Sequence, residues 1–396
     1  MLQKLILSVC ALTIVLNASM ASPSEIEQKF SKSASNFAAK LYQNSIQGKT
    51  GNVIISPVSV QTAVTLAMFG AAGETKQEML KGLEYQGFTD QIIADNYQRF
   101  GESVAKTNGL KIANKIYVMK GYSVKPTFQQ VATKSFNSEA EDVNFAQSKD
   151  SAGKINTWVE NQTNNKIKNL ISPDSLDADT RMVLVNAIYF KGFWTYQFDP
   201  KATFKAPFFL NDNDKVDVDF MKIKKHFKYG RFDDLDATAL ELPYKDSDIT
   251  MLIILPNKRT GLAELESKLD TIDFNELTTK MYSEEVNVEL PKFKIEFDIE
   301  LTEPLKKMGM EKMFSDAAQF DELLTSTEPL KVSQVVHKAF IEVNEEGAEA
   351  AAATAIMVTS YSLVIGKKIN FKCDRPFLFA LMKSNESLFM GRIQKF

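Results

Sequence analysis

The sequence has 396 residues, of which 44% are hydrophobic and 10% aromatic, so the chain can bury a sizeable core. Its 47 basic residues nearly balance its 50 acidic residues, which excludes the basic excess that nucleic acids and anionic membranes attract. With two histidines and two cysteines, the chain is also poor in the side chains that most catalytic and metal sites require.

The N-terminus has the pattern of a secretory signal. Lys4 supplies a positive charge, and the apolar run at residues 5–16 is shorter than the ~20 residues of a membrane-spanning helix. Small residues up to Ala21 are spaced like a cleavage site, so we expect residues 1–21 to be removed. An uncleaved membrane anchor is the alternative. The pattern therefore predicts a secreted protein in an extracellular fluid such as plasma or haemolymph, with no membrane partner.

The mature chain, residues 22–396, shows no linker and no repeat, and we expect it to form a single domain. Cys10 belongs to the signal, so Cys373 would stand alone and no intramolecular disulfide could form. Asn161 and Asn385 each open an N-x-S/T sequon among polar residues, and in a secreted protein both are candidate N-glycosylation sites.

The first half of the mature chain has the periodicity of helices. Ser56 and Pro57 form a helix start, residues 58–69 are apolar nearly all round, and Gly70 and Gly73 should end the helix. A helix that is apolar on every side is buried. Helical spacing predicts a second helix, lying on the surface, around Ile155, Trp158 and Val159.

From Met182 onward the pattern changes to strands. Residues 182–190 form an unbroken apolar run, typical of a central strand that is covered on both faces. Shorter strands are predicted at residues 239–242, 249–255, 286–290 and 331–336, with a C-terminal hairpin at 377–382 and 388–393. Short helices are expected at residues 262–269 and 302–308. Helices first and strands later indicate an α+β fold.

The sequence contains no recognisable catalytic motif: no G-x-S-x-G, no H-E-x-x-H, no P-loop and no paired C-x-x-C. His226 lies among lysines, which is typical of a solvated strand face, and His337 follows a predicted strand as a hydrogen-bonded core residue. A glycosidase-like pair of carboxylates stays open, because nothing singles out one Asp or Glu. We expect no enzyme activity, no metal and no cofactor.

Residues 345–362 are unusual because they are rich in alanine and follow a strand directly. An alanine-rich surface helix or a spacer is the simplest interpretation, although a short helix without packing is marginal. At a period of two, the only charge after Gly347, on Glu349, falls on one face. The other face is small or apolar and carries Ala348, Ala350, Ala352, Thr354, Ile356 and Val358. The segment is therefore a loop that could become a strand.

Six motifs in the expected order carry a family resemblance, at residues 52–59, 184–194, 332–337, 342–347, 374–379 and 388–392. On these motifs the mature chain resembles the serpins, the family of serine protease inhibitors, over essentially its whole length. The resemblance implies a fold of three β-sheets with about nine helices and an exposed reactive-centre loop at about residues 345–366. By the family role, a protease attacks this loop as a substrate. The loop then inserts into the main sheet while it is still acylated to the enzyme's serine.

The same resemblance gives the position of the bond that the protease would cleave. Counted from the hinge residue Glu345 as in inhibitory serpins, the cleaved bond joins Tyr361 to Ser362. A tyrosine suits the hydrophobic specificity pocket of chymotrypsin-like enzymes. Met357 or Leu363 would also suit a chymotrypsin-like or elastase-like pocket if the register differed. We therefore expect a monomeric inhibitor that forms a covalent complex with a chymotrypsin-like serine protease.

The hinge that enters the sheet begins at Glu345 and Gly347 and continues through Ala348, Glu349, Ala350, Ala351, Ala352 and Ala353. Ala348 stands where serpins usually have threonine or serine, but it is also small. A non-inhibitory serpin, acting as a carrier, storage protein or chaperone, is the alternative; such proteins tend to spoil the hinge with charge or bulk, which is absent here. Residues 92–111 form no extended basic helix, so heparin activation is not expected.

Other residues match serpin positions with structural roles. Four of them resemble the shutter, a polar cluster beneath the main sheet: Ser56, Ser59, Asn186 and His337. Trp194 resembles the aromatic residue at the breach, where insertion starts, and Glu345 is expected to pair with Lys292 there. Ordinary core polarity and packing explain each of these residues equally well.

Overall fold

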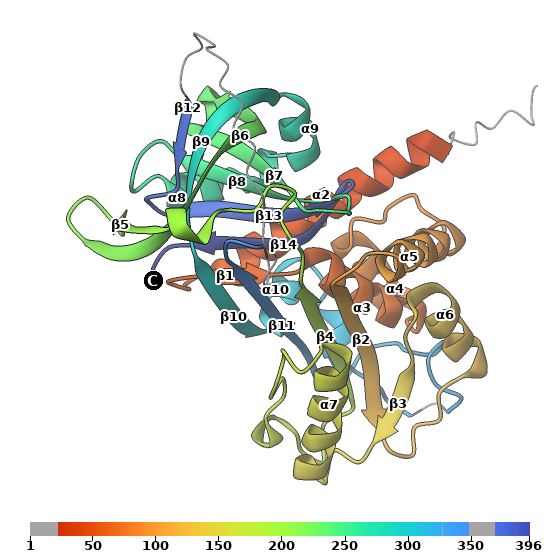
Figure 1. The fold of residues 1–396 in the computed structure, drawn as a ribbon. Helices are drawn as coiled ribbons and strands as arrows, with labels where there is room; N and C mark the ends of the chain where they lie inside the picture. Colours follow the sequence, from red (N-terminus) through yellow and green to blue (C-terminus); the bar gives the residue numbers. More distant parts are fainter. Residues whose placement is uncertain (1–22, 327, 348–368) are drawn as a thin grey trace, which may run out of the picture.

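The computed structural model describes residues 23–326, 328–347 and 369–396 (Figure 1). Residues 1–21, which the sequence predicts to be a secretory signal, lie outside the described part. The described residues form nine α-helices: α2 (Pro23–Ile46), α3 (Pro57–Phe69), α4 (Gly73–Gly82), α5 (Asp90–Ala105), α6 (Pro126–Phe136), α7 (Ser148–Gln162), α8 (Leu262–Ser267), α9 (Phe274–Thr279) and α10 (Thr302–Lys307). Five short 3₁₀ helices lie between them: Pro173–Ser175, Pro200–Ala202, Asp233–Leu235, Leu269–Thr271 and Lys312–Phe314.

A five-stranded sheet has the order β10-β11-β4-β2-β3. Its strands are β10 (Phe293–Glu300), β11 (Gln334–Val343), β4 (Met182–Phe190), β2 (Leu110–Met119) and β3 (Ala140–Val143). The central strands β4 and β11 are parallel and directly paired, from Gln334 opposite Val183 to Phe340 opposite Tyr189. Their outer neighbours, β2 and β10, are antiparallel to them. The centre of this sheet is therefore a parallel seam between two antiparallel pairs.

A nine-stranded sheet has the order β1-β14-β13-β8-β7-β6-β9-β12, with β5 paired to β6. Its strands are β1 (Val53–Ile55), β5 (Phe204–Phe209), β6 (Lys215–Phe232), β7 (Ala237–Pro243), β8 (Ile249–Pro256), β9 (Tyr282–Pro291), β12 (Ile369–Lys372), β13 (Phe377–Lys383) and β14 (Glu386–Ile393). The long strand β6 pairs with β5 at one end and with β7 at the other. The nine strands are hydrogen-bonded into one sheet, in which β6 joins the part that contains β5 to the part that contains β7. The three sheets that the sequence analysis expects therefore appear as two, because β6 connects two of them.

The helix predicted after Ser56 is α3, and it begins as the sequence indicates. The Ser56 hydroxyl accepts from the Ser59 N–H, Pro57 occupies the first turn, and Gly70 ends the helix. Gly73 has a different role from the predicted one. It starts α4 with φ +49°, and a Cβ there would lie 2.2 Å from the Gln319 side chain.

The strands predicted in the second half are present at the expected positions, except that one of them begins and ends later than predicted. The predicted strand 182–190 is β4, and all nine of its residues are buried. The strand predicted at 331–336 is β11, which begins at Gln334 and continues to Val343. Val332 and Ser333 precede the ladder: the Val332 N–H donates to the Met313 carbonyl, and the Ser333 N–H donates to the carbonyl of Met182, the first residue of β4. His337 therefore lies inside the strand and not after it.

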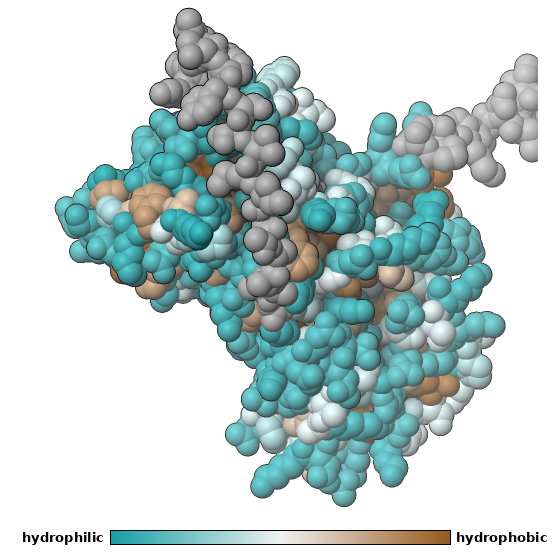
Figure 2. All heavy atoms as spheres, in the orientation of Figure 1, coloured by the Kyte–Doolittle hydropathy of each residue, from teal (hydrophilic) through white to brown (hydrophobic). Residues whose placement is uncertain are grey.

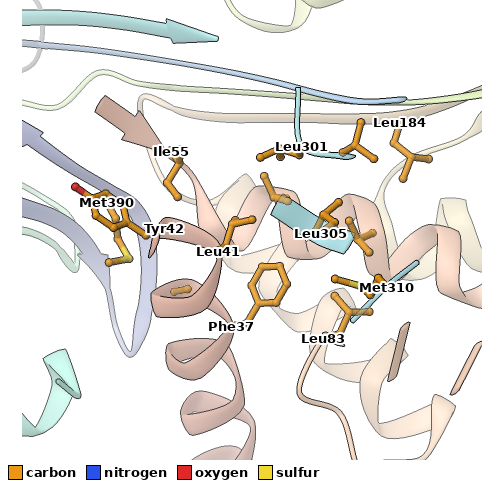
Figure 3. Close-up of a cluster of buried hydrophobic side chains, with 14 of the residues drawn as sticks. Phe37, Leu41, Tyr42, Ile55, Leu83, Leu184, Leu301, Leu305, Met310 and Met390 are labelled. Carbon is orange, nitrogen blue, oxygen red and sulfur yellow. The ribbon is translucent and has the colours of Figure 1, made fainter. Parts of the chain in front are cut away.

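The hydrophobic core has two main layers and a smaller one. One layer lies between the helices and both sheets, where Figure 3 shows Phe37, Leu41 and Tyr42 of α2 in the same cluster as Ile55 and Leu184. A second layer lies between the two sheets. The third lies between the five-stranded sheet and α7, which crosses that sheet in Figure 1. The five-stranded sheet is therefore covered on both faces, as the apolar run of β4 predicts.

The last two strands of the chain, β13 and β14, lie inside the nine-stranded sheet, next to its edge strand β1. β14 lies between β1 and β13, and β13 pairs in turn with β8. From β14 the buried Arg392 guanidinium donates to both carboxylate oxygens of Glu266, at 3.1 and 3.0 Å, and to the Lys49 and Gly51 carbonyls. The buried Tyr42 hydroxyl donates to the same carboxylate at 2.8 Å. This network connects the end of the chain to α2 and α8.

The face shown in Figure 2 is mainly hydrophilic, with small apolar areas between charged side chains. Within the described residues, no helix is both long enough and apolar enough to cross a membrane. The same residues contain no group of three or more His, Cys, Asp or Glu side chains arranged to hold a metal ion.

Candidate functional site

A polar cluster lies at the middle of the seam between β4 and β11. Sheet pairing places Asn186 of β4 opposite His337 of β11 and opposite Asn114 of β2. α3 brings Ser56 and Ser59 to the same place, because Ser56 is the N-cap residue of this helix. All five residues are buried. We call them the shutter cluster.

Hydrogen bonds connect the whole shutter cluster. The Asn186 amide group donates to the Ser59 hydroxyl and to Asn114 Oδ1, and its oxygen accepts from His337 Nδ1. On the far side of the imidazole, Nε2 accepts from the Ser56 N–H at 3.0 Å. These contacts require a neutral His337 with its proton on Nδ1. The cluster therefore joins three adjacent strands and one helix without a formal charge.

Burial sets the protonation of His337. Its side chain is fully buried, and desolvation of the charged form lowers the pKa of the imidazole to about 3. The cluster is consequently neutral at any physiological pH. His226, by contrast, is exposed on β6, as its lysine-rich surroundings predict.

A second cluster lies where β11 ends. The residues after Val343 form a tight turn, in which Asn344 and Gly347 exchange backbone hydrogen bonds of 2.9 and 3.2 Å. The segment that follows β4 holds this turn through hydrogen bonds. The Trp194 N–H donates to the Glu346 carbonyl at 2.8 Å, and the Trp194 indole donates to the Asn344 carbonyl at 3.0 Å. Trp194 thus links the end of β4 to the end of β11.

The carboxylate of Glu345 makes the charged contacts of this turn. Lys292 lies 2.9 Å from one carboxylate oxygen and 3.1 Å from the other, and the Thr203 hydroxyl donates to it at 2.7 Å. Burial favours the neutral acid. The hydrogen bonds from Lys292 and Thr203 outweigh that effect and hold the pKa of Glu345 below its ordinary value. Glu345 is therefore ionised at neutral pH.

Gly347 is required where the turn meets the segment after β4. Its backbone pairs with that of Phe193, and its φ is +142°. A Cβ at this position would lie 2.1 Å from the Gly192 carbonyl oxygen. We call Trp194, Tyr244, Lys292, Glu345 and Gly347 the breach cluster; Tyr244 belongs to it because its ring stacks on the Trp194 indole, with 4.3 Å between centroids.

A family model described as "Serpin (serine protease inhibitor)" matches residues 32–395. The chain belongs to the serpin family. Alaserpin of Manduca sexta is 38% identical over 379 residues, which cover 94% of this chain and 96% of the relative. Antichymotrypsin-2 of Bombyx mori is 37% identical, over 90% of this chain and 95% of the relative. The crystal structure of Serpin48, described as a highly specific serpin of the insect Tenebrio molitor, aligns with a TM-score of 0.86 and 35% identity, covering 93% of this chain and 98% of that chain.

The α+β serpin fold expected from the sequence is confirmed, and the structure brings together most of the expected positions. Ser56, Ser59, Asn186 and His337 meet at the shutter, and Trp194, Lys292, Glu345 and Gly347 meet at the breach. The remaining hinge and bait residues lie outside the described part of this serpin: Ala348, Glu349, Ala350, Ala351, Ala352, Ala353, Tyr361 and Ser362.

The two sequons lie on the surface of this serpin. Asn161 is exposed in the last turn of α7, and Asn385 is exposed in the turn between β13 and β14. The hydroxyl residues of the two sequons, Thr163 and Ser387, are buried. Asn161 and Asn385 therefore remain candidate glycosylation sites on the ground of exposure.

Two members of the clusters escaped the sequence analysis. Asn114 lies in β2, which also contains Lys111 and Lys115, and its role depends on the register that sets it opposite Asn186. Tyr244 follows β7, and its backbone forms an isolated bridge with Trp194, on whose indole its ring stacks. The apolar and β-branched residues among 110–119 could have revealed β2 and, with it, Asn114.

Proposed function

We propose that this serpin is a secreted, irreversible inhibitor of chymotrypsin-like serine proteases, cleaved between Tyr361 and Ser362. The observation that carries the proposal is the arrangement of the seam. β4 and β11 are paired in parallel, and the turn at Asn344–Gly347 reverses the chain directly after β11. A strand that continues from this turn would run antiparallel to both β11 and β4. Its insertion would replace one parallel pairing by two antiparallel pairings, which are slightly more stable per residue.

The chemistry belongs to the protease. Its serine oxygen attacks the Tyr361 carbonyl carbon, and the C–N bond to Ser362 breaks. The Ser362 amine leaves with a proton from the protease histidine, and Tyr361 remains bound to the enzyme as an ester. Hydrolysis of this ester would release active protease. Insertion between β4 and β11 before hydrolysis would drag the protease along and deform its active site, so inhibition is a competition between two rates.

The proposed specificity rests on Tyr361, whose ring suits a hydrophobic specificity pocket. The similarity to antichymotrypsin-2 agrees with this choice. Secretion rests on the signal pattern at residues 1–21, and the two exposed sequons are consistent with it. We propose a monomer in its free state, with neither metal nor cofactor.

The cleaved bond and the protease specificity are tested by mixing the pure protein with chymotrypsin and with trypsin. Wild type should form an SDS-stable complex with chymotrypsin, and Tyr361→Arg should lose this complex and form one with trypsin. Mass spectrometry of the released C-terminal peptide should show that it begins at Ser362. Cleavage without a stable complex would contradict the proposal and favour a non-inhibitory serpin.

Insertion is tested at the hinge with two matched charge variants. Ala350 is on the face expected to turn inward, so Ala350→Arg would bury an unpaired charge at a cost of several kcal/mol and slow insertion. The variant should be cleaved as an ordinary substrate and leave chymotrypsin active. Glu349→Arg lies on the opposite face and should retain most inhibition. The readout is the number of moles of serpin consumed per mole of protease inactivated. Equal values for both variants would refute the insertion mechanism.

A further inference from the structure

The turn between α5 and β2 contains the one asparagine–glycine pair of the sequence, Asn108-Gly109. α5 ends at Ala105, and β2 begins at Leu110. Asn108 is exposed in this turn. The hydrogen bond that closes the turn, from the Leu110 N–H to the Thr107 carbonyl, is long at 3.5 Å. The Asn108 side chain is therefore accessible to water, and the backbone around it is weakly held.

The main-chain nitrogen of Gly109 is available for reaction. Its N–H finds no hydrogen-bond partner among the residues that the structure describes, whereas the Gly109 carbonyl accepts from the Lys191 N–H at 2.8 Å. Glycine also has no Cβ that would shield this nitrogen. The side-chain amide carbon of an asparagine lies within reach of the next main-chain nitrogen through a small ring. The pair therefore brings an amide carbon and an unbonded nitrogen together in a solvent-exposed turn.

Asn137 offers a comparison within the same molecule. It is also exposed and is also followed by a small residue, Ser138, directly after α6. The Ser138 N–H, however, donates to the Ala132 carbonyl at 3.0 Å. A reaction of the Ser138 nitrogen must first break this hydrogen bond, which costs free energy. The two exposed asparagines thus differ in whether the nitrogen that follows them is free.

We propose that Asn108 is a site of spontaneous deamidation, a modification whose reactants are the chain itself and water. The Gly109 nitrogen attacks the Asn108 Cγ carbon, the Cγ–Nδ2 bond breaks, and the proton of the Gly109 N–H leaves with the ammonia. Water then adds to the cyclic imide and opens either of its two C–N bonds. The products are aspartate and isoaspartate, in which the main chain passes through Cγ. Each product carries a new carboxylate that is ionised at neutral pH.

Isoaspartate would disturb the end of the ladder between β2 and β4. It adds one carbon atom to the main chain directly before Gly109, and the next residue, Leu110, is paired with Phe190, the last residue of β4. Gly109 has no room to move toward Lys191, because a Cβ on Gly109 would lie 1.7 Å from the Lys191 carbonyl oxygen. The longer chain should therefore break the bond from Lys191 to Gly109. Loss of this hydrogen bond should lower the melting temperature by about 2 °C.

The test is incubation of the pure, intact protein in mildly alkaline buffer. Wild type should release ammonia and gain a more acidic band in isoelectric focusing, and peptide mapping should place aspartate and isoaspartate at position 108. Asn108→Gln should lose this band, because a glutamine must close a larger ring, which forms far more slowly. Asn137→Gln is the matched control and should gain the band as wild type does. A synthetic peptide of residues 104–113 sets the time that the reaction needs.

Three results would overturn the inference. They are an acidic band that persists in Asn108→Gln, modification of Asn137 in place of Asn108, and wild type that stays unmodified after the peptide has been fully converted. The melting temperature of each incubated protein is compared with that of its own fresh sample. If incubated wild type lost no more than incubated Asn108→Gln, the expected effect of isoaspartate on the ladder between β2 and β4 would be wrong.

Discussion

The shutter cluster and the breach cluster hold the same seam by different means. At the shutter, buried and neutral side chains bond to one another across three strands. At the breach, backbone groups hold a turn, and the one ion pair is partly exposed, with 40% of the Lys292 side chain open to solvent. The comparison teaches that the middle of the seam depends on the protonation of one imidazole. Its end depends on backbone geometry and on a screened charge pair.

The largest expected effect concerns the shutter and acidity. The unfolded chain protonates His337 near pH 6.5, whereas the folded chain does so only near pH 3. Protons therefore favour the unfolded state in this window. Stability should fall by about 1.4 kcal/mol per pH unit below pH 6.5, reaching about 4 kcal/mol near pH 3.

Urea unfolding between pH 8 and pH 5 measures this slope with little interference from carboxylates. His337→Gln should lower stability at pH 7 and flatten the slope below pH 6.5. His226→Gln is the control, since His226 is exposed and should leave the profile of wild type unchanged. A His337→Gln profile as steep as that of wild type would show that this imidazole does not control the seam.

The next largest effect concerns the turn at the breach. Gly347→Ala would place a Cβ 2.1 Å from the Gly192 carbonyl oxygen, in addition to the strain of φ +142°. We expect a loss of about 2–3 kcal/mol in the free energy of unfolding. Gly309→Ala separates the two causes, because Gly309 has φ +88° but nothing within 4 Å of a Cβ. It should lose only about 1 kcal/mol. Equal losses would mean that the contact with Gly192 is not limiting.

The smallest effect concerns the ion pair. The folded state holds the pKa of Glu345 below its ordinary 4.5, so the contribution of the carboxylate is present above pH 4.5 and is lost as the pH falls through the lower folded value. Because Lys292 is partly exposed, Glu345→Gln should cost less than about 1 kcal/mol at pH 7. The stability difference between Glu345→Gln and wild type should shrink in 1 M salt, whereas the difference between His337→Gln and wild type should not. A salt effect on both differences would contradict the contrast between the two clusters.

Local chemistry made several elements predictable. The cap and proline at the start of α3 and the unbroken apolar run of β4 each specify their element with few neighbours. The predicted start of β11 was wrong because the ladder with β4 begins only at Gln334. The N–H groups of Val332 and Ser333 donate instead to the Met313 and Met182 carbonyls. Sequence pattern does not carry that information.

The two clusters were predictable only through the family resemblance. Ser56, Asn186 and His337 lie far apart in the chain, and their contact depends on the parallel register of β4 and β11. Asn114 and Tyr244 were missed because no motif marked them. Each joins its cluster through contacts between distant segments: the pairing of β2 with β4 for Asn114, and a backbone bridge and ring stack with Trp194 for Tyr244.

The anchoring of the C-terminal strands has a consequence for how a cleaved molecule would behave. A cut after Tyr361 leaves a separate chain that contains β12, β13 and β14, and two of these strands lie inside the nine-stranded sheet. Arg392 binds this chain to Glu266 beneath α2. The two pieces should therefore co-migrate in a native gel and elute as one particle in size-exclusion chromatography. Only denaturant would separate them, so a nicked molecule would pass through purification undetected unless a denaturing gel were run.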